Sequence, residues 1–94
     1  MSKLPQLTAV ELIKILSGIG FKILRQEGSH IFLRHEDGRT TVVPNHPGRK
    51  LDRGLLNKII RKDIQISRED FMKLIWIILS ERAGINLDLG EIDG

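Results

Sequence analysis

The spacing of apolar residues predicts a helix near the N-terminus. Leucines and isoleucines between Leu12 and Ile19 recur three and four positions apart, as on the buried face of an α-helix. Thr8 and Glu11 stand three residues apart just before this run, which is the spacing of a capping box at a helix start. Gly20 follows the last apolar position and is a natural helix terminator. The first helix is therefore expected between Thr8 and Gly20.

Three short segments that follow have the pattern of β-strands. We expect strands at residues 21–26, 30–35 and 40–44, because these segments are rich in apolar and β-branched residues. Glu27-Gly28 divides the first two, and Asp37-Gly38 is the signal of a tight hairpin between the last two. Consecutive strands joined by short turns form an antiparallel meander.

Helical spacing returns after a polar loop at residues 45–50. Asp52 is placed to cap a second helix and Ser67 a third, since these side chains accept hydrogen bonds from a first helical turn. The order α-β-β-β-α, with an additional C-terminal helix, predicts an α+β domain: a three-stranded antiparallel sheet with helices on one face. The apolar positions of the two later helices are Leu55, Leu56, Ile59 and Ile60, and Phe71, Leu74, Ile75, Ile78 and Leu79.

Length and composition indicate one small globular domain. The chain of 94 residues allows a single modest core and contains no cysteine, which excludes disulfides and thiolate zinc sites. The longest apolar run, residues 74–79, is too short to span a membrane, and the first six residues lack the layout of a signal peptide. We therefore expect a cytoplasmic protein without membrane contact.

Charge divides the chain into two parts. Residues 1–66 contain twelve Lys/Arg and six Asp/Glu, a formal charge of +6, whereas residues 67–94 contain three and six, a charge of −3. A basic body indicates a polyanionic partner such as a nucleic acid. The alternative is two solvated faces of opposite sign.

Gly28-Ser29-His30 is the candidate site with the clearest chemistry. A glycine turn passes directly into a strand that starts with histidine, so the imidazole is attached to a stiff element. Histidine, with an ordinary pKa of about 6.5, gives or takes a proton near neutrality. The alternative is a structural histidine bonded to a neighbouring carbonyl. Alternation puts His30 on one strand face with Phe32 and Arg34, but both faces carry apolar residues, so the pattern leaves open which one faces solvent.

The other two histidines are weaker candidates. His46 lies in the proline loop and is a second acid–base group, a phosphate contact or merely a turn residue. His35 precedes a hairpin tip and is expected in solvent. The three histidines are spaced by five and eleven residues, which matches no familiar metal-ligand pattern. We therefore expect neither a metal ion nor another cofactor.

Basic residues gather at the start and outer side of the second helix. They favour contact with phosphate groups, although a solvated amphipathic face explains them almost as well. Aromatic residues are scarce, with three phenylalanines and one tryptophan, so stacking surfaces for bases should be limited and sequence readout weak. The cluster consists of Arg49, Lys50, Arg53, Lys58, Arg61 and Lys62.

Taken in order, these motifs resemble the HicA family of small mRNA-interferase toxins over about residues 9–75. The resemblance implies a fold like that of double-stranded-RNA-binding domains, cleavage of RNA through one histidine, which maps to His30, and silencing by an antitoxin of the HicB type. The motifs are Glu11-Leu-Ile-Lys-Ile-Leu16, Gly20-Phe21, Gly28-Ser29-His30, Asp37-Gly38-Arg39, Val42-Val43-Pro44-x-His46, Gly54-Leu55, Ile66-Ser67 and Glu69-Asp70-Phe71.

The chemistry agrees with that resemblance, because RNA carries its own nucleophile in the 2′-hydroxyl. Cleavage needs a base, an acid and cations around the phosphate, without a metal ion. We therefore expect a metal-independent endoribonuclease with His30 as the acid–base catalyst. Its candidate RNA contacts are Ser29, Arg34, His46, Arg49, Lys50, Lys58, Arg61 and Lys62.

Two alternatives remain open from the sequence. One is a non-catalytic RNA-binding module of the same fold. The other is an interaction protein that acts through its C-terminal helix, which is also a candidate seam for a homo-oligomer. We divide the chain accordingly into an RNA-binding and cleaving domain, residues 1–75, and a C-terminal helix extension with an acidic tail, residues 76–94.

Overall fold

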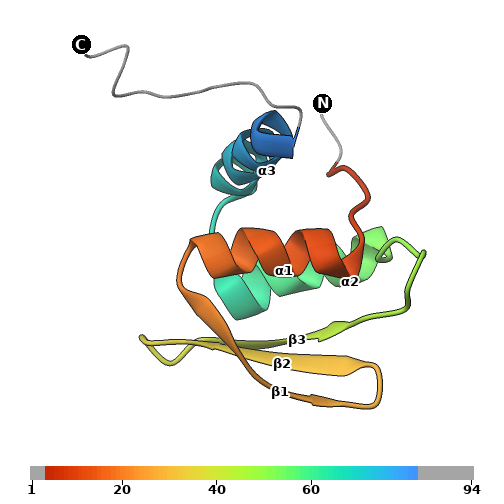
Figure 1. Ribbon diagram of the computed structural model, residues 1–94. Coiled ribbons are helices and arrows are strands. Elements are labelled where there is room, and N and C mark those ends of the chain that lie inside the picture. Colours follow the sequence, from red (N-terminus) through yellow and green to blue (C-terminus); the bar gives the residue numbers. More distant parts are fainter. Residues whose placement is uncertain (1–3, 83–94) are drawn as a thin grey trace.

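The computed structural model describes residues 4–82 and confirms the predicted order of elements (Figure 1). Of the predicted extension and acidic tail at residues 76–94, residues 83–94 lie outside the described residues. Three strands between helices form an α+β fold of the α-β-β-β-α type, like that of double-stranded-RNA-binding domains. The elements are α1 (Ala9–Gly18), β1 (Phe21–Glu27), β2 (His30–His35), β3 (Thr40–Pro44), α2 (Arg53–Lys58), a π-helical segment η1 (Ile59–Ile64) and α3 (Arg68–Arg82).

Side chains cap the helix starts as the sequence predicts. The Thr8 hydroxyl accepts a hydrogen bond from the Glu11 amide at 3.2 Å, and the Glu11 carboxylate accepts one from the Thr8 amide at 2.9 Å. Asp52 accepts from the Leu55 amide at 3.2 Å. Ser67 accepts from the amide three residues on, at 3.0 Å. These bonds satisfy amides that have no partner within the helix, and thereby fix where each helix begins.

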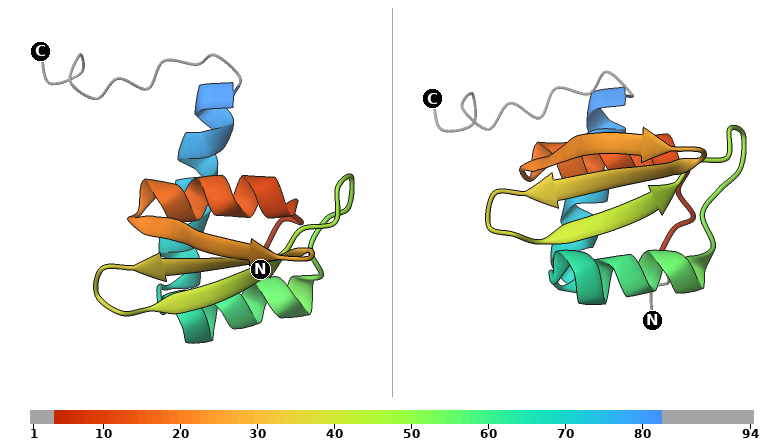
Figure 2. Two further views of the ribbon diagram at one scale, coloured as in Figure 1. Left: turned by 60° about the horizontal axis from the view of Figure 1, so that its bottom comes forward. Right: turned by 90° about the horizontal axis from the view of Figure 1, so that it is seen from below.

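The sheet is an antiparallel meander in the order β1-β2-β3, and its two faces differ. Ile31 and Leu33 of β2 and Val43 of β3 are buried under the helices. His30 and Arg34 are exposed on the opposite face. The helices lie on one side of the sheet in every view (Figures 1 and 2). His30 therefore lies on the outer face, which the described helices do not cover.

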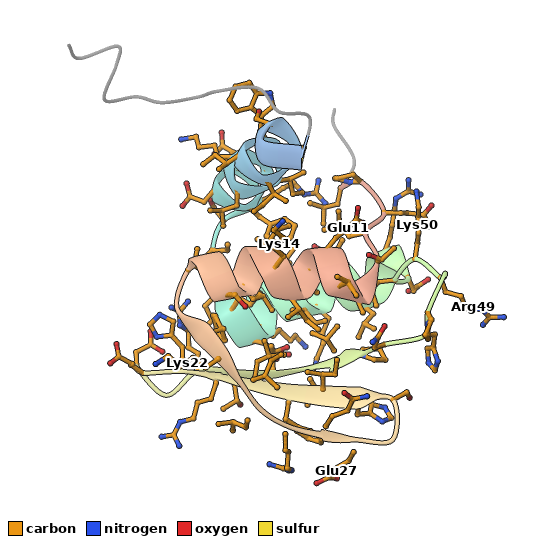
Figure 3. All side chains as sticks on the ribbon, in the orientation of Figure 1. Glu11, Lys14, Lys22, Glu27, Arg49 and Lys50 are labelled. Carbon is orange, nitrogen blue, oxygen red and sulfur yellow. The ribbon has the colours of Figure 1, made fainter. Side chains whose placement is uncertain are left out.

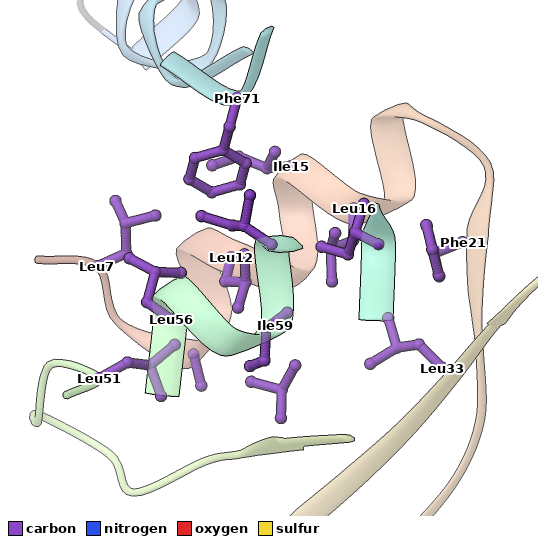
Figure 4. Packing of buried hydrophobic residues seen from close by; sticks show 14 of the residues in the cluster. Leu7, Leu12, Ile15, Leu16, Phe21, Leu33, Leu51, Leu56, Ile59 and Phe71 are labelled. Carbon is purple, nitrogen blue, oxygen red and sulfur yellow. The ribbon is translucent and has the colours of Figure 1, made fainter. Parts of the chain in front are cut away.

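Apolar side chains from all helices meet the inner face of the sheet in one core (Figure 4). Leu12 and Leu16 of α1, Leu56 of α2 and Phe71 of α3 are fully buried. The periodic leucines and isoleucines thus supply one side of the core, and the strands supply the other. Burial on this scale is the main favourable term in the folding of a small domain.

The second helix differs from the regular α-helix that the sequence predicts. Its latter half, Ile59–Ile64, is a π-helix, in which the Gln65 amide donates to the Ile60 carbonyl at 2.9 Å, and it ends where Gln65 adopts a φ of 60°. Ile60 and Ile64 are both buried. Residues four apart share a face in an α-helix as well, so the apolar pattern did not distinguish the two forms.

α3 packs on the core along one side, which includes Ile78 in its second half, and its other side carries exposed apolar residues. Phe71 and Ile75 are buried, whereas Trp76 is 59% exposed and Ile77 is 44% exposed. The Leu79 side chain lies outside the described part of the structure. Within residues 4–82, no helix has the length and apolar character needed to cross a membrane.

Candidate nucleic-acid interface

A tight turn holds His30 at the start of the central strand. Gly28 adopts a φ of 60°, which glycine reaches at little cost, and the chain reverses so that Glu27 of β1 pairs with His30. His30 also pairs with Pro44 of β3. The backbone of His30 thus has a paired strand on each side, and its side chain projects from the start of the central strand.

The His30 imidazole is open to solvent. The residue is exposed on the outer face, and within residues 4–82 no hydrogen bond reaches its ring. A histidine held only as a structural element would bond a neighbouring carbonyl, and His30 makes no such contact among the described residues. Its ring nitrogens are therefore accessible to a ligand in this part of the molecule.

The loop after β3 approaches the same end of the sheet. The Asn45 amide donates to the Ser29 carbonyl at 2.7 Å, and this bond fixes the loop to the turn that precedes His30. His46 is exposed, two residues beyond the strand partner of His30. Ser29, His30 and His46 are thus brought to one end of the sheet.

Arg49 and Lys50 extend this region around the edge of the domain. Both are exposed, and Figure 3 shows Arg49 on the loop that follows β3. Lys50 pairs with Thr8 in an isolated bridge at the start of α1. These two predicted phosphate contacts therefore lie between the sheet and the helix layer.

Three cations share the outer face of the sheet with His30. Arg34 lies on β2, and its register partner Lys22 lies on β1. Arg25 pairs with Phe32, and its guanidinium carbon is 4.1 Å from the centre of that ring. Of these, only Arg34 was among the predicted contacts. Lys22 and Arg25 were missed because their position depends on the cross-strand register, which the sequence pattern alone did not supply.

The basic residues of the second helix form a separate group in the helix layer. Lys58, Arg61 and Lys62 are all exposed, while the opposite side of the same segment packs into the core. Lys58 contacts the Asp63 carboxylate at 3.4 Å, and Asp63 accepts a hydrogen bond from the Thr41 hydroxyl at 2.9 Å. The group therefore lies along the β3 side of the sheet (Figure 2), around the edge from the outer face that carries His30.

His35 is a structural residue, which corrects the expectation that it is solvated. Its side chain is 20% exposed. Its Nε2 lies 3.0 Å from the Ile19 carbonyl, and its Nδ1 accepts from the Asp37 amide at 3.1 Å. Its ring also meets Phe21 edge-on, with centroids 5.2 Å apart. Alternation along β2 explains the difference, since position 35 lies on the same inner face as Ile31 and Leu33.

Asp37 and Arg39 form a cluster with His35 at the end of β2. The hydrogen bond from the Arg39 amide, followed by contacts with the Arg39 guanidinium and with His35, lowers the pKa of Asp37 below its ordinary value of 3.8. The Arg39 guanidinium also donates to the Ile64 carbonyl and so links the β2–β3 hairpin to the end of η1. The cluster lies at the opposite end of β2 from His30.

The described residues hold no group of three or more histidine or acidic side chains that would bind a metal ion. A hollow of about 430 Å³ lies among the helices, beside Asn57 and Arg61, away from the sheet. A second hollow of about 340 Å³ lies on the β1 side, bordered by Lys22, Leu24 and Arg34 among others. Of the two, only the second adjoins the outer face of the sheet.

Comparison with known proteins agrees with this arrangement. No curated protein matches the chain in sequence. Residues 9–66, more than half of the chain, match the family described as the HicA toxin of bacterial toxin–antitoxin systems. This range includes α1, the whole sheet, the His30 turn and the second helix. The chain therefore belongs to the HicA toxin family.

Proposed function

We propose that this toxin is a metal-independent endoribonuclease that cleaves mRNA in the cytoplasm, with His30 as its acid–base group. The observation that carries the proposal is the exposed imidazole of His30 on the central strand, on a face that also presents Lys22, Arg25 and Arg34. A nuclease of this kind needs a proton-transfer group held in a fixed position beside cations. The outer face carries the histidine, with Arg25 two positions along the sheet and Lys22 and Arg34 four positions along.

In the proposed reaction, the Nε2 or Nδ1 atom of His30 takes the proton of a ribose 2′-hydroxyl. The 2′-oxygen forms a bond to the adjacent phosphorus, and the bond from phosphorus to the 5′-oxygen breaks. The leaving 5′-oxygen takes a proton from water or from a second acid, for which His46 is the candidate at the same end of the sheet. The products are a 2′,3′-cyclic phosphate and a free 5′-hydroxyl, and no bond of the protein changes.

Phosphate contacts are proposed for two groups of residues. The first group is at the His30 end of the sheet and consists of Ser29, His46 and Arg49, with Arg34 on the outer face toward the other end of β2. Lys50, Lys58, Arg61 and Lys62 continue around the edge of the domain. Since phosphate oxygens are bound largely through charge, these contacts would position RNA without reading its sequence.

The antitoxin implied by the family is proposed to be of the HicB type and to act by covering His30. The basic body of the chain would attract an acidic partner, and such attraction mainly accelerates association. A second candidate function is supported by α3, where Trp76 and Ile77 are exposed. Apolar side chains in that position fit a protein contact, including a homo-oligomer formed through this C-terminal helix.

The test of the nuclease proposal is cleavage of RNA by His30→Ala. Because one acid–base group contributes roughly 10²–10⁴ in rate, the variant should lose at least about a hundredfold in activity. His30 is exposed, so the variant should retain the unfolding free energy of the parent. Lys14→Ala, which alters an exposed residue of α1, is the matched control and should cleave normally (Figure 3).

The same assay is run with excess EDTA, and activity should persist. A folded His30→Ala protein that cleaves as fast as the parent would exclude His30 as the catalyst. Loss of activity in EDTA, with the fold intact, would instead point to a metal-dependent reaction.

A further inference from the structure

An arginine lies over a half-buried phenylalanine on the same face as His30. Phe32 is half-buried on β2, two residues beyond His30, and the two side chains project from the same side of the sheet. The Arg25 guanidinium carbon lies 4.1 Å from the centre of the Phe32 ring. Two residues of a strand span about 7 Å, so this pair is the next outward-facing position along β2 from the candidate catalytic group.

A carboxylate holds Arg25 in this position. Its Nε donates to Glu27 at 2.6 Å, and the Arg25 side chain remains 53% exposed. Figure 3 places Glu27 at the end of β1, on the side of the sheet away from the helices. The Arg25 guanidinium is thus held by Glu27, lies over the Phe32 ring and stays open to solvent. Proteins stack the unpaired bases of RNA on aromatic rings and on arginine planes of this kind.

The other aromatic side chains lie elsewhere. Phe21 and Phe71 are buried in the core, and Trp76 lies on α3. Phe32 is thus the one aromatic side chain on the outer sheet face in the described part of the chain. A base that stacks on a phenylalanine or tryptophan ring near His30 would therefore do so on the Phe32–Arg25 pair.

The surrounding charge favours an anionic strand over an apolar partner. By register, Lys22, Arg25 and Arg34 contribute three cations to this face, against one carboxylate from Glu27. Lys22 and Arg34 lie opposite each other and border the hollow of about 340 Å³ at the far end from His30. Cations beside a stacking surface suit a strand whose phosphates flank each base, and here Lys22 and Arg34 supply them on the side of the pair away from His30.

We propose that Phe32 and Arg25 form a stacking platform for one unpaired base of the RNA, next to the nucleotide whose phosphate reaches His30. The inference rests on the proposed nuclease function and specifies its substrate as single-stranded. A base inside a double helix is stacked on its neighbours and does not present its face to the platform. Because every base has such a face, the platform would require an unpaired base without selecting its identity.

The test measures binding of two short fluorescent RNAs to proteins that all carry His30→Ala, so that no RNA is cleaved. One RNA is a single strand of mixed sequence, and the other has the same length with abasic nucleotides throughout. Arg25→Lys keeps the charge and removes the plane, and Phe32→Leu removes the ring. Arg68→Lys, the same exchange at the first residue of α3, is the matched control.

Arg25→Lys and Phe32→Leu should each weaken binding of the base-containing RNA by about 5- to 150-fold, the range for loss of one stacked base. Binding of the abasic RNA should not change. The salt dependence of Arg25→Lys should match that of the parent, because the number of charges is unchanged. Arg68→Lys should bind both RNAs like the parent.

The platform is excluded if Arg25→Lys binds the base-containing RNA as tightly as the parent, or if it loses affinity equally for both RNAs. Arg25 is exposed, so this comparison stands even where Phe32→Leu fails to fold. Cleavage by the chain with His30 intact separates the two proposals. Base-dependent binding without any cleavage would support the platform and exclude the nuclease proposal. Cleavage that requires His30 but not Arg25 would support the nuclease proposal and exclude the platform.

Discussion

Substitution of Gly20 tests how the fold holds the His35 ring at the end of β2. Gly20 joins α1 to β1 with a φ of 103°, and a Cβ at this position would lie 2.7 Å from Nε2 of His35. A carbonyl only accepts, so that nitrogen carries the proton that it donates to Ile19 at 3.0 Å. Gly20→Ala should therefore push the His35 ring away from Ile19 and from its edge contact with Phe21.

The expected cost has two parts that a second glycine separates. The positive φ alone costs an alanine about 1–3 kcal/mol of the free energy of unfolding. The lost hydrogen bond and the lost ring contact each contribute about 0.5–1.5 kcal/mol. Gly38 has a φ of 100° and nothing within 4 Å of a Cβ, so Gly38→Ala measures the backbone strain alone. The loss of unfolding free energy in Gly20→Ala should exceed the loss in Gly38→Ala by about 1–3 kcal/mol.

Urea unfolding of both variants gives the two free energies. The same pair is then measured in a His35→Ala background, where the ring is absent and the two glycine substitutions should cost about the same. Equal costs in the parent background would refute the reasoning, as would an excess for Gly20→Ala that persists without His35.

Two further predictions concern charge. Replacing Lys58, Arg61 and Lys62 together by Gln should weaken RNA binding and reduce the slope of affinity against salt, because fewer counterions are released; an unchanged slope would place the RNA away from the helix layer. The pKa of Asp37 in the folded protein lies below its ordinary value, chiefly because the Arg39 amide donates a hydrogen bond to it. The ionised carboxylate therefore stabilises the fold above about pH 4, and this stabilisation is lost as the pH falls through the folded pKa. Asp37→Asn should accordingly lower the unfolding free energy at pH 7 more than at pH 3, and an equal loss at both would show that the carboxylate charge contributes nothing.

The sequence by itself determined the order of the elements and where the helices begin, because those depend on contacts between near neighbours. The capping box joins residues three apart, and the caps at Asp52 and Ser67 act over the same distance. The hairpin at Asp37-Gly38 is equally local, with a φ of 100° at its glycine. Local hydrogen bonds and glycine turns can be read from the residues in order, so the α-β-β-β-α layout was predictable.

Only the packing of the helices decided that His30 lies on the exposed face of the sheet. Alternation placed Phe32 on one face of β2 and Ile31 and Leu33 on the other, and apolar residues on both gave no preference. The helices bury Ile31 and Leu33 and thereby turn His30 outward. The inward position of His35, which the sequence was wrongly taken to leave in solvent, follows from the same packing.

The Phe32–Arg25 pair required the register of the sheet as well. Simple alternation from buried Phe21 would place Arg25 on the inner face, but the pairing shifts between Ile23 and Arg25. One extra residue in a strand moves every later side chain to the opposite face, so Arg25 and Glu27 join His30 on the outer side. The residues thus supplied the histidine and the cations, while strand pairing and helix packing, which act between segments far apart in the chain, decided that they share a face.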